Sequence, residues 1–240
     1  MNVIRVKDYE SLSLEAAKIV GELLKTKPKS HLGLATGSSP IGLYQNLIKM
    51  FKNNEISFKH VKTYNLDEYC GLPKEHKESY YSFMHRNLFD HVDISEKNIH
   101  LPSSEGKNLE KNCKTYNRLL HKANIDLQVL GIGSNGHIGF NEPGTSFEQE
   151  TFIVKLTEKT RQDNKRFFNS IEEVPTYSIT MGIKNIMQAK QILMLISGAS
   201  KQSAVKQLLS GNISEDFPAS VLHKHENVTI IIDDAAYGDL

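Results

Sequence analysis

The chain has 240 residues, of which 39% are hydrophobic and 24% are charged, as in folded globular proteins and unlike disordered ones. Its 29 Lys and Arg and 28 Asp and Glu leave a net charge of +1, which argues against a nucleic-acid binder that depends on bulk charge. Two cysteines, Cys70 and Cys113, are too few for a disulfide framework or a four-cysteine zinc site, and they fit a reducing compartment. Residues 1–8 lack the apolar core of a secretory signal, and the longest apolar run, 192–196, is far shorter than a membrane span. We therefore expect a cytoplasmic protein with neither nucleic acid nor membrane as a partner.

Helical and extended segments alternate along the chain. Apolar residues at helical spacing predict helices at residues 12–24, 41–51, 80–91, 109–123, 158–168, 182–189 and 199–209. Short apolar runs between turn residues predict strands at 31–35, 61–66, 99–101, 125–130, 151–156, 177–181, 191–197 and 228–232. Without a repeat or a linker, this alternation predicts one α/β domain over residues 1–240, with a mostly parallel sheet between two layers of helices.

Ligands of such folds bind beyond the carboxyl ends of the strands, so the loops that follow strands are where chemistry is expected. The first of these loops is Thr36-Gly37-Ser38-Ser39-Pro40. Its glycine, its hydroxyls and the helix that begins after it are typical of an anion site. The same residues also suit an ordinary helix start, and the segment alone does not decide between the two. It is not a Walker A loop, because no Gly-Lys-Ser/Thr follows.

Two acids, Asp67 and Glu68, follow the strand predicted at 61–66. A carboxylate at that position can serve as a general base over the edge of the sheet. Taken by itself, the segment is better explained as a solvated turn.

The loop at residues 131–144 contains more candidate functional residues than any other loop that follows a strand. Residues 131–136 match the G-x-G-x-x-G pattern, but Gly139, Pro143 and Gly144 prevent the helix that a dinucleotide site needs. We therefore expect no nicotinamide or flavin cofactor. The glycines, Gly133 and Gly136 among them, allow the backbone to approach a ligand closely. The loop also holds Asn135, His137 and Glu142, in which a histidine is flanked by groups able to orient it for proton transfer.

Two single cations complete the pattern. Arg166 lies late in the helix predicted at 158–168, and Lys201 lies at the start of the helix that follows the strand at 191–197. A lysine near a helix amino end opposes the helix dipole, and a bound anion would explain its presence. Taken alone, each cation is better explained as a solvated surface charge.

Together these segments resemble the glucosamine-6-phosphate deaminase family over essentially the whole chain. The resemblance depends on five segments, which are residues 34–40, 65–69, 131–144, 166–168 and 197–201. It implies a modified Rossmann-like three-layer α/β fold. It also implies the conversion of D-glucosamine 6-phosphate and water to D-fructose 6-phosphate and ammonia, in amino-sugar catabolism, without a metal or an organic cofactor.

The resemblance also implies roles for individual residues. Asp67 would move a proton between C2 and C1 of the sugar, and His137 would open the pyranose ring while Asn135 and Glu142 orient it. The phosphate would be bound by Thr36, Gly37, Ser38, Ser39, Arg166 and Lys201. We further expect the N–H groups of Gly133 and Gly136 to support developing oxygen charge, and residues 151–181 to form a lid-like segment.

One catalytic position departs from part of the family, because some members have Asp where this chain has Asn135. A neutral amide orients an imidazole without stabilising its protonated form. Glu142 is then the charged partner for His137, and we expect activity to survive with an altered pH dependence.

A second departure concerns regulation. Some longer relatives are hexamers that N-acetylglucosamine 6-phosphate activates, and they have basic residues in the strand after the histidine loop. This chain has Phe152 and Val154 there, and apolar side chains do not bind a phosphate dianion. We therefore expect hyperbolic kinetics and a monomer or small homo-oligomer.

Two other functions fit parts of the pattern. A 6-phosphogluconolactonase-type hydrolase shares the histidine loop but does not require residues 65–69 or 140–143. A non-catalytic sugar-phosphate sensor would be expected to lose Asp67 or His137, and both are present.

Overall fold

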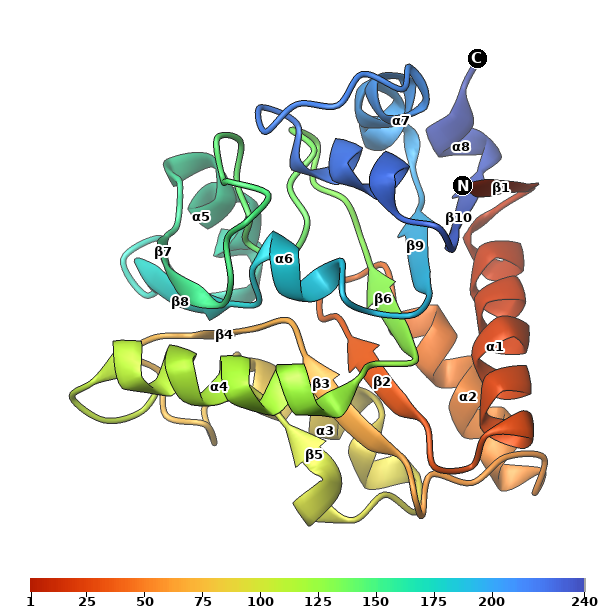
Figure 1. The fold of residues 1–240 in the computed structure, drawn as a ribbon, viewed down its shortest axis with the longest axis horizontal. Helices are drawn as coiled ribbons and strands as arrows, with labels where there is room; N and C mark the ends of the chain where they lie inside the picture. Colours follow the sequence, from red (N-terminus) through yellow and green to blue (C-terminus); the bar gives the residue numbers. More distant parts are fainter. Residues whose placement is uncertain (240) are drawn as a thin grey trace.

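The main sheet of the protein has seven parallel strands in the order β1-β10-β9-β6-β2-β3-β5 (Figure 1). The computed structural model describes residues 1–239, apart from the side chains of Asp163 and Phe167. The strands are β1 (Asn2–Val6), β2 (His31–Leu34), β3 (Lys62–Asn65), β5 (Ile99–His100), β6 (Leu127–Leu130), β9 (Ile192–Ile196) and β10 (Val228–Asp233). Because all seven run the same way, the loops after β2, β3, β6, β9 and β10 meet at one edge of the sheet.

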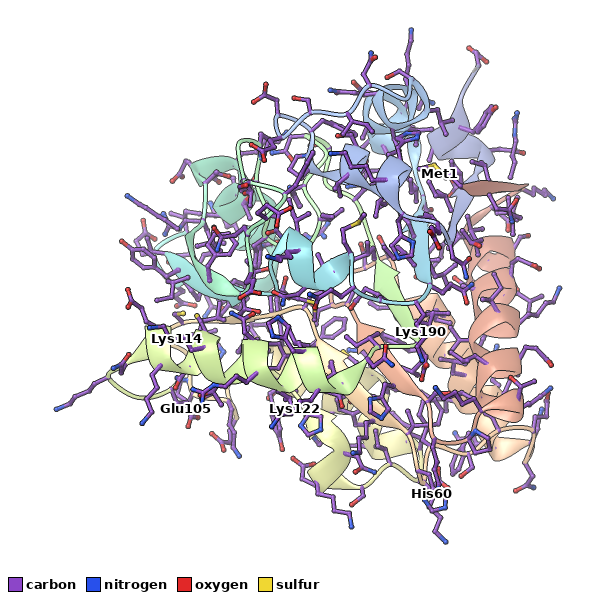
Figure 2. The ribbon with its side chains drawn as sticks, viewed as in Figure 1. Met1, His60, Glu105, Lys114, Lys122 and Lys190 are labelled. Atoms are coloured by element: carbon purple, nitrogen blue, oxygen red, sulfur yellow. The ribbon has the colours of Figure 1, made fainter. Side chains whose placement is uncertain are left out.

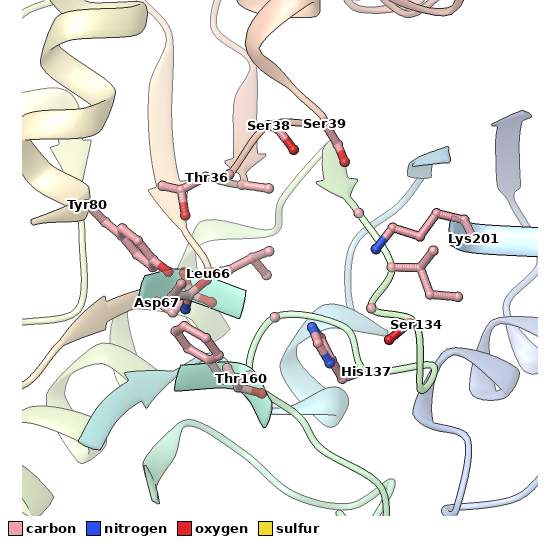
Figure 3. A pocket seen from close by; sticks show the side chains of 18 of the residues that line it. Thr36, Ser38, Ser39, Leu66, Asp67, Tyr80, Ser134, His137, Thr160 and Lys201 are labelled. Atoms are coloured by element: carbon pink, nitrogen blue, oxygen red, sulfur yellow. The ribbon is translucent and has the colours of Figure 1, made fainter. Parts of the chain in front are cut away.

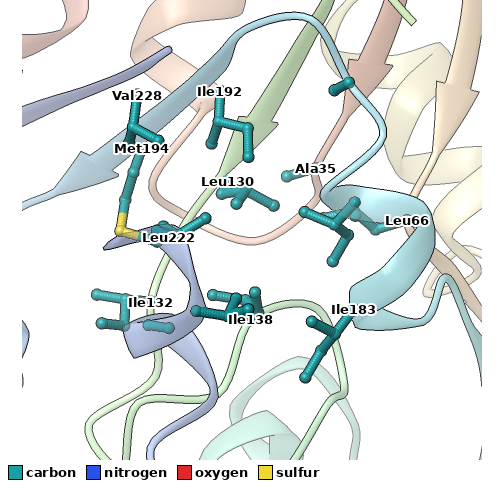
Figure 4. Close-up of a cluster of buried hydrophobic side chains, with 14 of the residues drawn as sticks. Ala35, Leu66, Leu130, Ile132, Ile138, Ile183, Ile192, Met194, Leu222 and Val228 are labelled. Atoms are coloured by element: carbon teal, nitrogen blue, oxygen red, sulfur yellow. The ribbon is translucent and has the colours of Figure 1, made fainter. Parts of the chain in front are cut away.

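Helices cover both faces of this sheet, so the expected three-layer α/β fold is confirmed. One face packs against α1 (Tyr9–Thr26), α2 (Ile41–Lys52) and α3 (Tyr80–Asn87). The other packs against α4 (Leu109–Ala123), α6 (Ile183–Ile186), α7 (Gln202–Leu209), the 3₁₀ segment η5 (Pro218–Lys224) and α8 (Asp234–Tyr237). Every residue of β9 is buried, which explains why its sequence is apolar without alternation. Figure 4 shows the core on this second face, where Met194 and Ile192 lie with Leu222 and Leu130.

Two of the expected strands are not in the main sheet. They are β7 (Phe152–Lys155) and β8 (Tyr177–Thr180), which form an antiparallel sheet with β4 (Asp67–Tyr69) in the order β4-β8-β7. Only Leu66 separates β3 from β4, so the small sheet starts at the carboxyl edge of the large one. The pattern did not predict β4, because Asp and Glu are depleted in strands, and pairing with β8 is what makes this segment extended.

Three expected helices are shorter than predicted and continue or begin as 3₁₀ turns. The helix expected at 158–168 is α5 (Glu158–Asn164) followed by η3 (Lys165–Phe167). The helix expected at 199–209 begins as η4 (Ala199–Lys201), and the helix expected at 80–91 ends at Asn87, before the turn η1 (Phe89–His91). A further turn, η2 (Glu96–Asn98), precedes β5. Arg166 and Lys201 therefore both lie in tight 3₁₀ turns.

Charged side chains project from the outside of the fold. Figure 2 shows this for Glu105, Lys114 and Lys122, which are all exposed around α4. Within residues 1–239, no helix has both the length and the apolar character needed to cross a membrane.

Candidate active site

A pocket of about 220 Å³ lies at the edge where the loops after the parallel strands converge (Figure 3). It is lined by Thr36, Gly37, Ser38, Ser39, Asp67, Gly133, His137, Arg166 and Lys201, all of which the sequence analysis singled out. Asp67 and Tyr80 lie on one side of it, and His137 and Lys201 lie on the other. The pocket lining does not include Asn135, Glu142 or Gly136, although all three come from the same loop as His137.

The loop at residues 36–39 is held in place by a tyrosine from another element. Gly37 has φ +86°, a left-handed conformation that favours glycine. The Tyr9 hydroxyl donates to the carbonyl oxygens of Ser38 at 2.9 Å and Ser39 at 3.2 Å. The Tyr9 hydroxyl oxygen also accepts the N–H of Gly42, 2.9 Å away, in the first turn of α2. The loop and the amino end of α2 are thus ordered before any ligand arrives, as an anion site requires.

Asp67 is a buried carboxyl group at the wall of the pocket. Its residue is only 5% exposed, and its backbone pairs with Thr180 of β8. Burial raises the pKa of Asp67 to about 8, and the neighbouring charge of Glu68 adds to the effect. A general base is most effective when its pKa lies near the working pH, so this environment suits proton abstraction.

Glu68 has a structural role, because its carboxylate accepts three backbone N–H groups. The donors are Tyr69 at 2.8 Å, Tyr80 at 2.9 Å and Tyr81 at 2.9 Å. Two of these are at the start of α3, so Glu68 fixes that helix against β4. Burial raises the pKa of Glu68, and the three N–H donors oppose that rise. Of the two adjacent acids, only Asp67 lines the pocket.

His137, Asn135 and Glu142 form a hydrogen-bonded chain. The Asn135 side-chain nitrogen donates to Glu142 Oε2 at 2.9 Å, and a carboxylate can only accept. The Asn135 oxygen therefore faces His137 Nδ1, 2.7 Å away, and Nδ1 must carry a proton to donate to it. Glu142 Oε2 is 3.8 Å from Nδ1, so Glu142 orients the imidazole mainly through Asn135 rather than by direct contact. In the neutral imidazole this leaves Nε2 as the basic nitrogen.

Two glycines of this loop, Gly133 and Gly136, allow it to fold tightly. The N–H of Gly133 donates to the His137 carbonyl at 2.9 Å, and the N–H of Gly136 donates to the Gly133 carbonyl at 3.0 Å. Both of these N–H groups are therefore already hydrogen-bonded within the loop, and support of developing oxygen charge by the N–H groups of residues 131–136 stays a prediction. A Cβ at Gly133 would lie 2.1 Å from the imidazole, and one at Gly136 would lie 2.2 Å from the Phe217 ring. Glycine is required at both positions because the loop folds tightly around His137 and against Phe217.

Helix α5 and the turn after it close one side of the pocket, through Thr160, Asn164 and Arg166. The Thr160 hydroxyl donates to Glu142 Oε1, and the Thr157 hydroxyl, which caps α5, donates to Thr160 at 2.9 Å. The hydrogen-bonded chain that starts at His137 therefore ends on this helix. The Asn164 amide also donates to the Tyr69 hydroxyl at 2.8 Å, which ties the same helix to β4.

Two cations reach the pocket from separate elements. Lys201, on η4, points into it beside Ser134 and His137, and Arg166, on η3, lines the same pocket. With the 36–39 loop they surround a region rich in donors, which suits an anion. Among the described residues, no three His, Cys, Asp or Glu side chains are grouped closely enough to hold a metal ion.

The sequence analysis missed Tyr9, Tyr80, Thr160 and Asn164. Tyr80 is partly buried, its hydroxyl interacts with those of Thr36 and Tyr69, and its ring centroid lies 4.7 Å from that of Tyr69. Thr157 has a local signal, since a threonine just before a helix that starts with an acidic residue is typical of a helix start. Nothing local marks Tyr9 or Tyr80, because each acts on a loop far away in the sequence.

Comparisons with known proteins agree with this geometry. The model of the family described as glucosamine-6-phosphate isomerases/6-phosphogluconolactonase matches residues 8–231. The glucosamine-6-phosphate deaminase of Oceanobacillus iheyensis is 54% identical over 241 residues, covering 100% of this chain and 96% of that protein. The glucosamine-6-phosphate deaminase of Clostridium botulinum strain Langeland is 50% identical over 241 residues, covering 100% and 99%.

Solved structures extend the comparison. A monomeric glucosamine-6-phosphate deaminase superposes with a TM-score of 0.97 at 48% identity, over 98% of both chains. The 6-phosphogluconolactonase of Thermotoga maritima superposes with a TM-score of 0.76 at 20% identity, over 97% of this chain and 98% of that one, so it shares the fold alone. By its matched length and its relatives, this chain belongs to the glucosamine-6-phosphate isomerase/6-phosphogluconolactonase family.

Proposed function

We propose that this protein is a glucosamine-6-phosphate deaminase, which converts D-glucosamine 6-phosphate and water to D-fructose 6-phosphate and ammonia. The observation that carries the proposal is that a buried carboxyl with a raised pKa and an imidazole of defined tautomer line one pocket with an anion-binding loop and two cations. The identity of about 50% to deaminases over the full chain supports it.

The phosphate end of the substrate would be bound by the loop at residues 36–39, by Arg166 and by Lys201. The phosphate does not react, and its binding holds the reacting carbons near Asp67 and His137. Helix α5 contributes Thr160 and Asn164 to the pocket, so we propose that residues 151–181 act as its lid.

The chemistry would begin with ring opening. His137 Nε2 takes the proton of the O1 hydroxyl and delivers it to O5 as the C1–O5 bond breaks, which leaves an aldehyde at C1. Asn135 holds Nδ1–H throughout, so the imidazole is in the correct tautomer to start.

Isomerisation and deamination would follow. Asp67 takes the proton from C2 and a C1–C2 double bond forms, while the protonated amine on C2 gives a proton to O1, so that an enol with a neutral amine at C2 results. Return of the proton to C1 leaves an iminium at C2, water adds to it, and ammonia departs to give the C2 carbonyl of fructose 6-phosphate. Burial of Asp67 favours this sequence because it keeps the base weakly hydrated and its pKa near 8.

Ammonia release from D-glucosamine 6-phosphate, measured together with fructose 6-phosphate, tests the proposal. Equal amounts of both products are expected, at a rate that depends on Asp67 and His137. Hydrolysis of 6-phosphogluconolactone without ammonia release would indicate the lactonase activity instead, and binding without turnover of either compound would indicate a sensor. We further propose that the protein acts as a monomer in the cytoplasm, and sedimentation of the purified protein tests its size.

A further inference from the structure

The carboxylate of Asp233 lies at the carboxyl end of β10, directly behind the turn that carries Lys201. The residue is 3% exposed. Asp233 Oδ2 accepts the Ser197 hydroxyl, and Oδ1 accepts the N–H of Gly198 at 3.1 Å. Oδ1 also accepts the N–H of Ala236 at 2.8 Å, which makes Asp233 the cap of α8. A single side chain thus joins the end of β9, the end of β10 and the start of α8.

The turn held in this way controls where Lys201 lies. Gly198 has φ +94°, so the chain reverses sharply at the residue whose N–H Asp233 accepts. The Gly198 carbonyl then accepts the N–H of Lys201 at 3.0 Å, which closes the η4 turn. One residue later, the Gln202 amide donates to the Ala235 carbonyl at 2.9 Å and fixes the other side of the turn to α8.

We propose that Asp233 is a positioning residue for substrate binding, because it holds the Ser197–Lys201 turn in the conformation that presents the Lys201 ammonium to the sugar phosphate. The inference rests on the proposed function only in taking Lys201 as a phosphate ligand. Asp233 does not line the pocket, so it acts through the turn rather than by touching substrate.

The direction in which phosphate affinity changes distinguishes a positioning role of Asp233 from a purely electrostatic one. Asp233 is an acid near the end of the pocket where an anion would bind, so removing its charge alone would strengthen phosphate binding. Loss of the turn geometry would weaken it. Asn keeps an oxygen for the two N–H donors, and the Ser197 hydroxyl can accept from its amide, so Asp233→Asn preserves the geometry without the charge.

The test measures the dissociation constant of fructose 6-phosphate by calorimetry, and kcat and KM for glucosamine 6-phosphate. We expect Asp233→Ala to raise both the dissociation constant and KM about tenfold, with kcat within about threefold of wild type. Asp233→Asn should stay within about threefold in all three constants. Asp126→Ala is the matched control. Its carboxylate is also buried, 6% exposed, and accepts the N–H of His31 and the ammonium groups of Lys27 and Lys190 at the opposite edge of the sheet.

An unchanged dissociation constant in Asp233→Ala would overturn the proposal, as would an equal rise in Asp126→Ala or an equal rise in Asp233→Asn. If Asp233→Ala does not fold, Ser197→Ala removes one of the three hydrogen bonds and leaves the cap of α8 intact. It should raise the dissociation constant about threefold, and an unchanged value would equally refute the proposal. Wild-type protein that binds fructose 6-phosphate but releases no ammonia would refute the deaminase assignment, while the ratios between variants still decide the role of Asp233.

Discussion

At the scale of single residues, the burial of Asp67, which suits the proposed base, also affects the stability of the protein. In the folded protein the pKa of Asp67 is raised to about 8, whereas in an unfolded chain it is about 3.9. The folded state therefore binds more protons between these pH values, and the stability of the protein falls as pH rises from about 4 to about 8. The buried carboxylate of Asp67 therefore makes the fold less stable than a neutral side chain at this position would.

The first prediction is that Asp67→Asn lowers deamination by at least about 10²-fold and stabilises the folded state. The gain should be small near pH 4, grow as pH rises, and exceed about 1 kcal/mol at pH 9, since one pKa unit corresponds to about 1.4 kcal/mol. Turnover assays and urea unfolding of both proteins at pH 5 and pH 9 measure this. A variant that is less stable than wild type at pH 9 would show that the carboxylate is stabilised by its surroundings.

The second prediction concerns the pH profile of kcat/KM. The base must be ionised, so activity should rise with pH on the acid side, with a midpoint near the raised pKa of Asp67, about 8. Glu68→Gln removes the neighbouring charge and keeps one of the two oxygens that accept the α3 N–H groups, so this midpoint should move to lower pH. The substrate phosphate titrates at about pH 6 with both enzymes. Its contribution therefore cancels when the two pH profiles are compared. Superimposable acid limbs would remove Asp67 as the titrating group.

The third prediction addresses the imidazole. Asn135→Leu keeps the approximate size of the side chain but removes the acceptor for His137 Nδ1–H and the donor to Glu142, so the tautomer is no longer specified. Turnover should fall about 10²-fold. Asn135→Asp keeps an acceptor and should retain activity with a changed pH dependence. Steady-state rates of both variants across pH measure this, and a fully active Leu variant would contradict the role of the chain His137–Asn135–Glu142.

At the scale of elements, the site is assembled from turns that project from a rigid parallel sheet. The two cations lie on 3₁₀ turns after α5 and β9, and each turn is tied to a neighbouring element by side-chain hydrogen bonds. Helix α5 contacts the histidine loop through Thr160 and Glu142, and also through Lys159, whose ammonium is 2.7 Å from the Ser134 hydroxyl. The turns proposed to bind phosphate and the residues proposed to transfer protons are therefore supported by the same few elements.

The fourth prediction belongs to these turns. Arg166→Ala and Lys201→Ala should each raise KM about ten- to a hundredfold, because a hydrogen bond to a charged group contributes about 1.5–3 kcal/mol and about 1.4 kcal/mol is a factor of ten. Both variants should also lose much of the preference for glucosamine 6-phosphate over glucosamine. Lys165→Ala, at an exposed neighbouring position, is the control. An unchanged preference in both would place the phosphate elsewhere.

At the scale of the whole molecule, the small sheet determines the surroundings of the two apolar positions of β7, Phe152 and Val154. Val154 is buried against Tyr69, Phe140 and Leu156, and Phe152 packs against the same cluster. These positions, where activated relatives are expected to be basic, instead form the apolar contact of β7 with β4 and the histidine loop. A basic side chain at Val154 would have to bury its charge.

The fifth prediction follows for regulation. Substrate saturation should be hyperbolic, and N-acetylglucosamine 6-phosphate should act at most as a competitor at the catalytic pocket, because allostery needs a second site with different affinity for two states. Titrations of substrate at several concentrations of this compound, with sedimentation at the same protein concentration, measure both points. A sigmoidal curve that straightens as the compound is added would reveal a regulatory site elsewhere in the protein.

The sequence by itself determined the features that depend on near neighbours in the chain. Periodicity predicted the alternating helices and strands, and the rule that ligands bind after parallel strands placed Thr36, Asp67, His137 and Lys201 near one another. This prediction succeeded because the loop that follows a parallel strand lies at the carboxyl edge of the sheet. The resemblance then supplied the reaction, which no spacing within the chain specifies.

Only the tertiary structure decided the features that depend on distant pairs. Pairing with β8 makes residues 67–69 a strand, and Tyr9 holds the loop at Ser38 from 29 residues away. Asp233 reaches Ser197 across 36 residues. Asn135, Glu142 and Thr160 specify one imidazole tautomer only when helix α5 is packed against the histidine loop. The physical reason is that a hydrogen bond leaves no local pattern when its two partners are brought together by the packing of the whole sheet.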